Sequence, residues 1–200
     1  NLGKLKEAEL SLRKAIEIKP DFAEAHSNLG NTLRNLGKLK EAELLTRKAT
    51  QLKPNFAMAH SNLGTILIDL GKLKEAEIST RKAIELNPNF ADAHYNLGNI
   101  LKDLGKLEEA ELSIRKAIEL NPNLAEVHSS LGSILNDMNK LEEAELSTRK
   151  AIQIKPDLTE AHFQLGEILL RKGNHIEGIK CIKKSTGFIR FDLINGLSIN

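Results

Sequence analysis

The sequence predicts an all-α solenoid of about eleven helices, in which antiparallel helix pairs stack one behind the other. The main observation is a period of 34 residues shared by all five prolines: Pro20, Pro54, Pro88, Pro122 and Pro156. Five of the six histidines keep the same period. Apolar residues also recur at helical spacing twice within each period. A fixed period of this length is typical of stacked supersecondary units that share a core.

One period corresponds to a pair of helices. Leu29 and Leu33 keep helical spacing before Gly37, and Leu39 and Ala42 resume it afterwards. The glycine stands where the first helix must end, so we expect it to adopt the left-handed conformation of a helix C-terminus. The same position recurs along the chain, once as asparagine: Gly3, Gly71, Gly105, Asn139 and Gly173.

Each period also carries a start signal for the next helix. The residue after the proline is always Asp or Asn, which are good N-caps: Asp21, Asn55, Asn89, Asn123 and Asp157. In four cases an acidic residue stands three positions later, as in a capping box: Glu24, Asp92, Glu126 and Glu160. We therefore expect the Asp and Asn side chains to cap the helices that follow.

The positions that recur most regularly are those of Leu29, Gly30, Leu33, Gly37, Leu39, Ala42, Ala49 and Pro54. A unit built on these residues resembles the tetratricopeptide repeat, a helix-turn-helix found in bacterial arrays and attached to O-linked N-acetylglucosamine transferases. The resemblance implies a right-handed superhelix. His26 and Thr46 stand where this family prefers Trp and another aromatic residue, and these departures concern local packing, not the fold.

The resemblance divides the chain into a half repeat, four complete repeats and a degenerate last repeat: 1–22, 23–56, 57–90, 91–124, 125–158 and 159–186. The array ends there because Gly178 and Ser185 replace alanines and no proline follows. Since Asn1 aligns with Asn35 in the middle of a repeat, we expect the sequence to be a piece of a longer protein.

The tail at 187–200 has a different pattern. Apolar and charged residues alternate around Phe191, and Asn195-Gly196 offers a tight turn, which predicts a strand and the start of a hairpin. One interpretation is that the tail begins a following region that the sequence truncates. Another is that it lies extended in a groove of its own or a neighbouring array.

Composition narrows the function classes. The 29 basic and 27 acidic residues give a net charge of +2, which argues against a general binder of nucleic acids or anionic membranes. No apolar run approaches the roughly 20 residues of a membrane span. The single Cys181 excludes an internal disulfide framework and fits a reducing compartment, so we expect a cytoplasmic location.

No pattern in the sequence predicts catalysis. A metal site needs about three ligands close together, whereas the histidine row supplies one ligand per repeat, so we interpret His26 and its copies as packing residues. Cys181 lacks a paired histidine motif, and there is no glycine-rich phosphate loop. We therefore expect no enzyme activity, no cofactor and no metal site.

The resemblance implies that the first helix of each repeat lines a concave, peptide-binding surface. Serines at Ser27, Ser61 and Ser129 are expected on it, together with the candidate binding residues Asn28, Asn31, Asn62, Thr65, Tyr95, Asn96, Asn99, Lys102, Ser130, Phe163 and Gln164. An amide can bond both the N–H and the C=O of an extended peptide. The alternative is that these asparagines are common repeat residues that bond locally.

Charges on the first helices indicate the kind of partner. Eight acidic residues at these and the cap positions outnumber three basic ones: Glu24, Asp69, Asp92, Asp103, Glu126, Asp137, Glu160 and Glu167 against Arg34, Lys102 and Arg171. A neutral or basic segment is therefore favoured.

These observations predict a protein-interaction scaffold that binds an extended or helical peptide segment. One alternative is a non-catalytic, substrate-recruiting module of a larger enzyme with a downstream domain of glycosyltransferase, sulfotransferase or oxygenase type. Another is a structural array that self-associates through its end repeats or its tail, since Leu2, Leu5 and Leu12 would lack a capping repeat.

Overall fold

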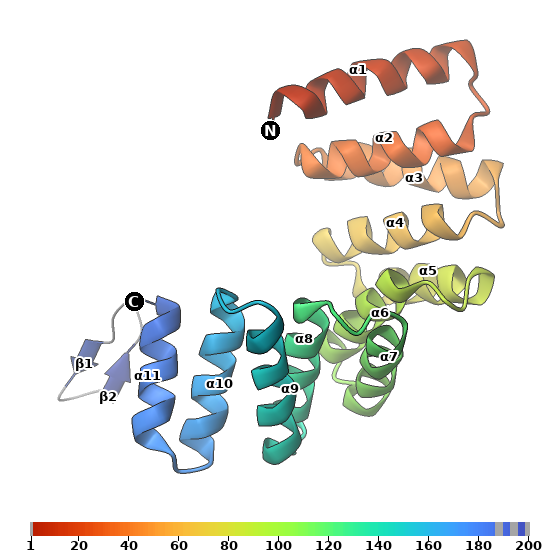
Figure 1. Cartoon of the computed structure of the whole chain (residues 1–200). Coiled ribbons are helices and arrows are strands. Elements are labelled where there is room, and N and C mark those ends of the chain that lie inside the picture. The colour runs from red at the N-terminus through yellow and green to blue at the C-terminus, as the bar shows by residue number, and fades with distance from the viewer. Residues whose placement is uncertain (1, 187–189, 193–195, 199–200) are drawn as a thin grey trace. The chain divides into compact units, whose positions relative to one another are not determined.

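The computed structural model describes residues 2–186, 190–192 and 196–198. Most of the described residues are helical (Figure 1), in the elements α1 (Leu2–Ile18), α2 (Ala23–Asn35), α3 (Leu39–Leu52), α4 (Ala57–Asp69), α5 (Leu73–Leu86), α6 (Ala91–Asp103), α7 (Leu107–Leu120), α8 (Ala125–Asp137), α9 (Leu141–Ile154), α10 (Thr159–Arg171) and α11 (His175–Thr186). The chain forms two compact units, Asn1–Gly105 and Lys106–Asn200. The predicted all-α architecture of about eleven helices is confirmed.

In the first unit, α2 pairs with α3 and α4 with α5, and the first helices α2, α4 and α6 are neighbours. Leu29 and Leu33 form one buried cluster with Ile66 of the next repeat, and Leu12 of α1 packs against the cluster. Leu12 is therefore half-buried, whereas Leu2 at the start of α1 is 61% exposed. Because each cluster draws on successive repeats, the core is continuous along the unit.

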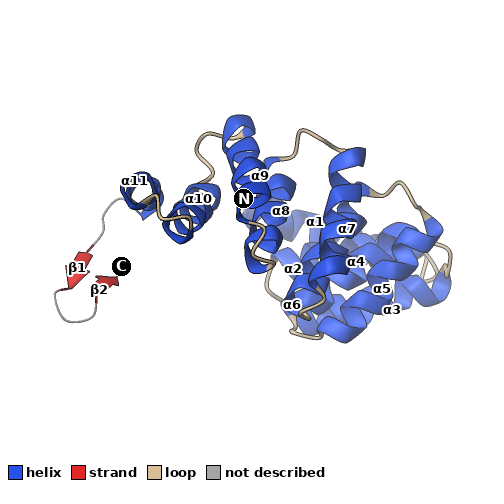
Figure 2. Cartoon of the chain, turned by 90° about the horizontal axis from the view of Figure 1, so that it is seen from below, coloured by secondary structure: helices blue, strands red, loops and turns tan. Residues whose placement is uncertain are grey.

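The second unit contains α7 to α11. Here α8 pairs with α9 and α10 with α11, and α10 also packs against α8 and α9. The core side chains Leu131, Ile134, Leu135, Ile168 and Leu169 are at most 4% exposed. After α11, the strands β1 (Arg190–Asp192) and β2 (Gly196–Ser198) pair antiparallel, as the predicted hairpin requires (Figure 2). Asn195 of the predicted turn lies outside the described residues.

The turns inside the repeats have the predicted backbone conformation. Gly37, Gly71 and Gly173 have φ angles of 75°, 72° and 82°, and Asn139 in the same position has 60°. Left-handed φ values are strained for residues that carry a Cβ, and Asn tolerates these values better than most residues. Gly3 is different, because it lies inside α1 and has no described helix before it that it would end.

The predicted N-caps were wrong. The residues at the cap positions are apolar and form no side-chain cap hydrogen bond: Phe22, Phe56, Phe90, Leu124 and Leu158. Asp21 and its copies lie one residue too early, in the turn that follows the proline. In two repeats a lysine ammonium lies over the phenylalanine ring at the cap position, with Lys53 Nζ 5.0 Å from the centre of the Phe56 ring.

A close contact holds the two helices of a repeat together. A Cβ added at Gly30 would overlap Thr46 Oγ1, and one added at Gly132 would overlap Thr148 Oγ1. Thr46 Oγ1 donates to the Ala42 carbonyl oxygen at 2.8 Å, which satisfies this buried hydroxyl. Threonine in place of the family's aromatic residue is thus matched to a glycine on the facing helix.

Ion pairs link the second helices of successive repeats. Glu43 accepts hydrogen bonds from Arg47 on its own helix and from Lys72 in the next repeat. Arg47 also donates to Glu75 on α5. The pKa of the Glu43 carboxyl is lowered, first by the Lys72 hydrogen bond and then by Arg47, although partial burial opposes the shift. The second unit repeats this network around Glu111 and Glu145.

Gly132→Ala is expected to destabilise the chain by about 1 to 3 kcal/mol, because the added methyl group overpacks the contact with Thr148. Higher helix propensity, worth about 1 kcal/mol, offsets part of this loss. Urea denaturation followed by circular dichroism measures the change. A Thr148→Ala background removes the overlap with Oγ1 but keeps close contacts with the Ala144 carbonyl oxygen and the Cβ of residue 148 at 3.2 and 3.3 Å, so the same glycine substitution should cost less there. Equal losses in both backgrounds would contradict the packing explanation.

Glu145→Gln is expected to lower the thermal midpoint by a few degrees near neutral pH. Lys172 is the first cause that lowers the folded-state pKa of Glu145 below its ordinary value of 4.5. The stabilisation is therefore complete above about pH 4.5 and is lost as the pH falls through the lowered value. At acidic pH below both values, variant and parent should melt alike. Glu142→Gln removes an equal charge from an exposed neighbour and serves as the control.

Candidate functional site

The histidine row holds the loops between repeats. In every repeat, ring Nε2 lies 2.8 to 2.9 Å from the carbonyl oxygen of the proline six residues earlier. His26, His128 and His162 are buried. The ring therefore satisfies a turn carbonyl while it packs at the start of the helix, a role that the sequence did not reveal. Among the described residues, no group of three or more His, Cys, Asp or Glu side chains is arranged to hold a metal.

Cys181 is half-buried in α11. Burial, with a smaller contribution from the Glu177 charge, raises the pKa of its thiol. A thiol that stays protonated at neutral pH is a poor nucleophile. This cysteine therefore acts as a small packing group.

Amide side chains link the first helices of the first unit. Asn62 Nδ2 on α4 donates to Ser27 Oγ on α2 at 3.0 Å, and Asn96 Nδ2 on α6 donates to Thr65 Oγ1 on α4 at 3.2 Å. We call Asn28, Asn62 and Asn96 the amide row. Asn28 is exposed on α2, whereas the other two are half-buried.

The remaining candidates of the first unit surround the amide row on the same helices. Asn31 is exposed on α2, and Tyr95, Asn99 and Lys102 are half-buried on α6. The structure thus places all of these candidates on first helices, as predicted. The serines were misplaced, because Ser27 and Ser61 are at most 5% exposed. They precede the amide row by one residue, so they face the interior while the amides face outward.

In the second unit, a serine links the first helices α8 and α10. Ser129 Oγ donates to Gln164 Oε1 at 2.7 Å, and the candidate binding residue Ser130 is half-buried beside it on α8. Gln164 Nε2 then donates to Glu160 at 3.1 Å. Gln164 and Phe163 line a hollow with a volume of about 490 Å³, together with Ser133, Thr159, Glu160, Glu167 and Ser185.

Ion pairs neutralise part of the predicted acidic surface. Asp69 pairs with Arg34, Glu24 with Lys53, and Glu126 with Lys155. The two lysines lie outside the first helices, so the sequence count overstated the excess of negative charge. In the second unit, burial and then the Asp137 charge raise the pKa of Glu167, while the nearby Arg171 charge opposes this shift.

Models of repeat families match most of the chain. Two models described as tetratricopeptide repeat match residues 23–56 and 91–124, and 125–158 and 159–190. A third, described as TPR repeat, matches residues 1–37 and 64–105. The chain belongs to the tetratricopeptide repeat family.

Solved structures of tetratricopeptide proteins share the fold. YrrB, described as a TPR protein with an unusual peptide-binding site, is 26% identical with a TM-score of 0.72, over 88% of this chain and 91% of YrrB. A MamA structure is 27% identical with a TM-score of 0.71, over 78% of this chain and 92% of its own. MamA from Desulfovibrio magneticus RS-1 is 22% identical with a TM-score of 0.75, over 82% and 93% of the two chains.

Comparison with curated protein sequences finds no match. The tetratricopeptide repeats and their structural relatives support a protein-interaction scaffold. None of the helices in the described ranges is both long enough and apolar enough to cross a membrane.

A second set of hollows, which sequence reasoning missed, lies between successive second helices of the tetratricopeptide repeats. They involve α3 and α5, α7 and α9, and α9 and α11, with volumes of about 650, 440 and 440 Å³. A signal was present in the sequence, because aliphatic residues that prove to be exposed recur with the repeat period, and Ile78 and Leu146 among them line hollows. The series is Leu10, Leu44, Ile78, Leu112 and Leu146. Their exposed fractions are 63 to 72%.

His162→Phe is expected to cost about 1 to 3 kcal/mol, because the Pro156 carbonyl oxygen loses its partner in a part-buried position. Phenylalanine keeps a ring but has no donor. The free energy of unfolding from chemical denaturation measures the loss. His175→Phe is the matched control, since His175 is exposed at the start of α11 and lies outside the row. Equal effects of the two substitutions would contradict the proposed role of the row.

Proposed function

We propose that the first helices of this scaffold hold an extended peptide segment of a partner protein through the amide row. The single observation that carries the proposal is the way in which the amides are bonded. Asn62 and Asn96 each commit one N–H to a hydroxyl of the preceding repeat. Their carbonyl oxygens form no hydrogen bond within the described residues, so each amide retains an acceptor and a second donor.

The spacing of the helices suits an extended ligand. Packed helices lie about 8 to 10 Å apart, and an extended chain advances about 3.3 Å per residue. Amides on successive first helices would therefore meet roughly every third residue of a peptide. Because main-chain groups are present in every peptide, this contact supplies affinity with little sequence preference. Specificity would come from neighbours that differ between repeats, such as Tyr95 on α6.

The hollow on α10 supports the preference for neutral or basic segments. Phe163 provides an apolar wall, and Glu160 and Glu167 provide carboxylates in the same hollow of about 490 Å³. The stem of a Lys or Arg side chain can pack on an aromatic ring while its charge meets a carboxylate. A cation bound there would also lower the pKa of Glu167, which burial raises.

The description of YrrB as having a peptide-binding site gives independent support for a peptide as the ligand. At 26% identity, that relative supports the class of partner and not its sequence. The proposed role is binding, since the amides of the row keep hydrogen-bonding groups that suit a peptide main chain.

The double substitution Asn62→Ala and Asn96→Ala is expected to weaken binding of peptides selected on the parent chain by about tenfold or more, as two main-chain contacts are lost. Isothermal titration calorimetry measures the change. Ser27→Ala is the matched control, because it removes the bond to Asn62 and keeps the amide. Unchanged binding in the double variant, or equal loss in the serine control, would count against the amide row.

A further inference from the structure

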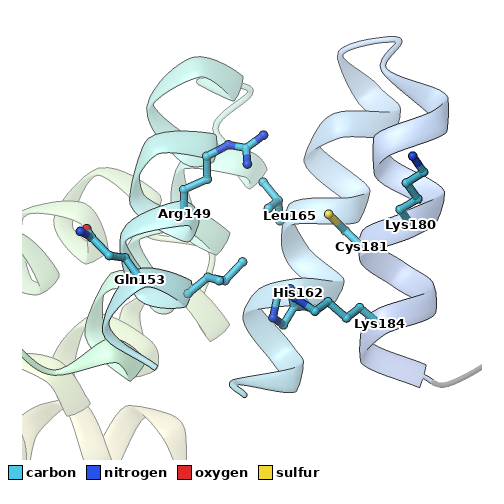
Figure 3. Close-up of a pocket in the computed structure, with 8 residues that line it drawn as sticks. Arg149, Gln153, His162, Leu165, Lys180, Cys181 and Lys184 are labelled. Atoms are coloured by element: carbon cyan, nitrogen blue, oxygen red, sulfur yellow. The ribbon is translucent and has the colours of Figure 1, made fainter. Parts of the chain in front are cut away.

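The hollow between α9 and α11 has a different composition from its counterparts. Figure 3 shows Arg149 reaching from α9 toward α10, which contributes His162 and Leu165. Gln153 also lines the hollow from α9, and its amide points away from α10 in this view. From α11 come Lys180, Cys181 and Lys184. Ile152 completes an apolar base with Leu165, and the hollow has a volume of about 440 Å³.

The equivalent hollow one repeat earlier, between α7 and α9, provides an internal reference. At the position of Lys180 it has Leu146, and at the position of Gln153 it has Glu119. Its lining thus contains two cations and one carboxylate, whereas the later hollow contains three cations and no carboxylate. The hollow between α3 and α5 also carries carboxylates, Glu75 and Glu85, beside its cations. Only the last of these three hollows has a lining without acidic side chains.

The cations of this hollow differ in how far they are neutralised. Arg149 pairs with Glu145 and Glu177. Lys180 and Lys184 form no ion pair within the described residues. In the hollow between α7 and α9, Lys150 at the position of Lys184 also pairs with no carboxylate of the described residues and donates to Gln153, so the charge of the two hollows differs at Lys180 and Gln153. In Figure 3, Lys184 extends from α11 toward His162. Positive charge without a counter-charge therefore adjoins an apolar base.

We propose that this hollow binds an acidic peptide segment of a partner protein, with carboxylates on Lys180 and Lys184 and an aliphatic side chain on Ile152 and Leu165. Charge complementarity identifies the occupant, because unpaired cations favour an anionic partner. The neighbouring surface favours a peptide over a small anion, since Leu112 and Leu146 continue the row of Lys180 on α7 and α9 and are each 70% exposed. The site lies outside the amide row and has the opposite charge preference.

The test uses a fluorescein-labelled hexapeptide, Glu-Leu-Glu-Glu-Leu-Glu, and its neutral analogue with Gln for every Glu. Fluorescence anisotropy with the full chain should show the acidic probe binding about tenfold or more tightly than the neutral one. The double variant Lys180→Leu and Gln153→Glu gives this hollow the residues of its neighbour and should reduce affinity for the acidic probe by about tenfold. Its circular dichroism should be unchanged, because both residues already occupy the same positions in the preceding repeat.

The reciprocal change tests the same idea as a gain. Leu146→Lys with Glu119→Gln should convert the hollow between α7 and α9 into a second site, so the stoichiometry of probe binding should rise from one to about two. The Asn62→Ala and Asn96→Ala variant should bind this probe like the parent, which separates the proposal from that for the amide row.

Three results would overturn the proposal: no binding of the acidic probe, equal binding of the two probes, or equal affinity of the parent and the Lys180→Leu, Gln153→Glu variant. Displacement of the acidic probe by inorganic phosphate at a concentration equal to that of the probe would also overturn the proposal, because it would indicate a site for small anions.

Discussion

The stacking of one repeat on the next is the constraint on which the rest of the structure depends. A helix pair of this length has apolar residues on two sides, and it cannot bury both sides without a neighbouring repeat. Leu29 and Leu33 are buried because α4 contributes Ile66 to the same cluster. The glycine and threonine contact inside the repeat keeps its two helices close enough for that cluster to be shared. Packing inside one repeat therefore sets the spacing of its neighbours.

Polar bonds then fix how successive repeats align, and they differ on the two sides of the array. Amide and hydroxyl groups join first helices, as in the Asn62 and Ser27 pair, together with the ion pair between Arg34 and Asp69. Carboxylates and guanidinium groups join second helices, as in Glu43, Arg47 and Glu75. Ion pairs are weakened by salt and acid, whereas neutral amide bonds are not. The second-helix side carries more of these ion pairs, so its stability responds more strongly to solution conditions.

The sequence predicted what depends on local conformation and on period. Gly37 needed a positive φ wherever a helix had to turn back, and the structure has it. The prediction of an N-cap at Asp21 failed because the cap of α2 is the apolar Phe22, one residue later. Residue preferences for cap positions do not locate a helix start to within one residue. The roles of Ser27 and Arg34 depend on residues about one repeat away, so only the stacked structure reveals their partners.

Regular positions explain the fold, and irregular ones carry the information about ligands. If Lys180 served only to keep α11 soluble, any polar residue would suffice, and the loss of a carboxylate at Gln153 on another helix would have no reason to accompany it. Both changes alter the charge of one hollow in the same direction. On the first helices of the same unit, Glu160 and Glu167 make a hollow of the opposite character beside Phe163. One helix, α10, thus contributes to the linings of two hollows of opposite charge.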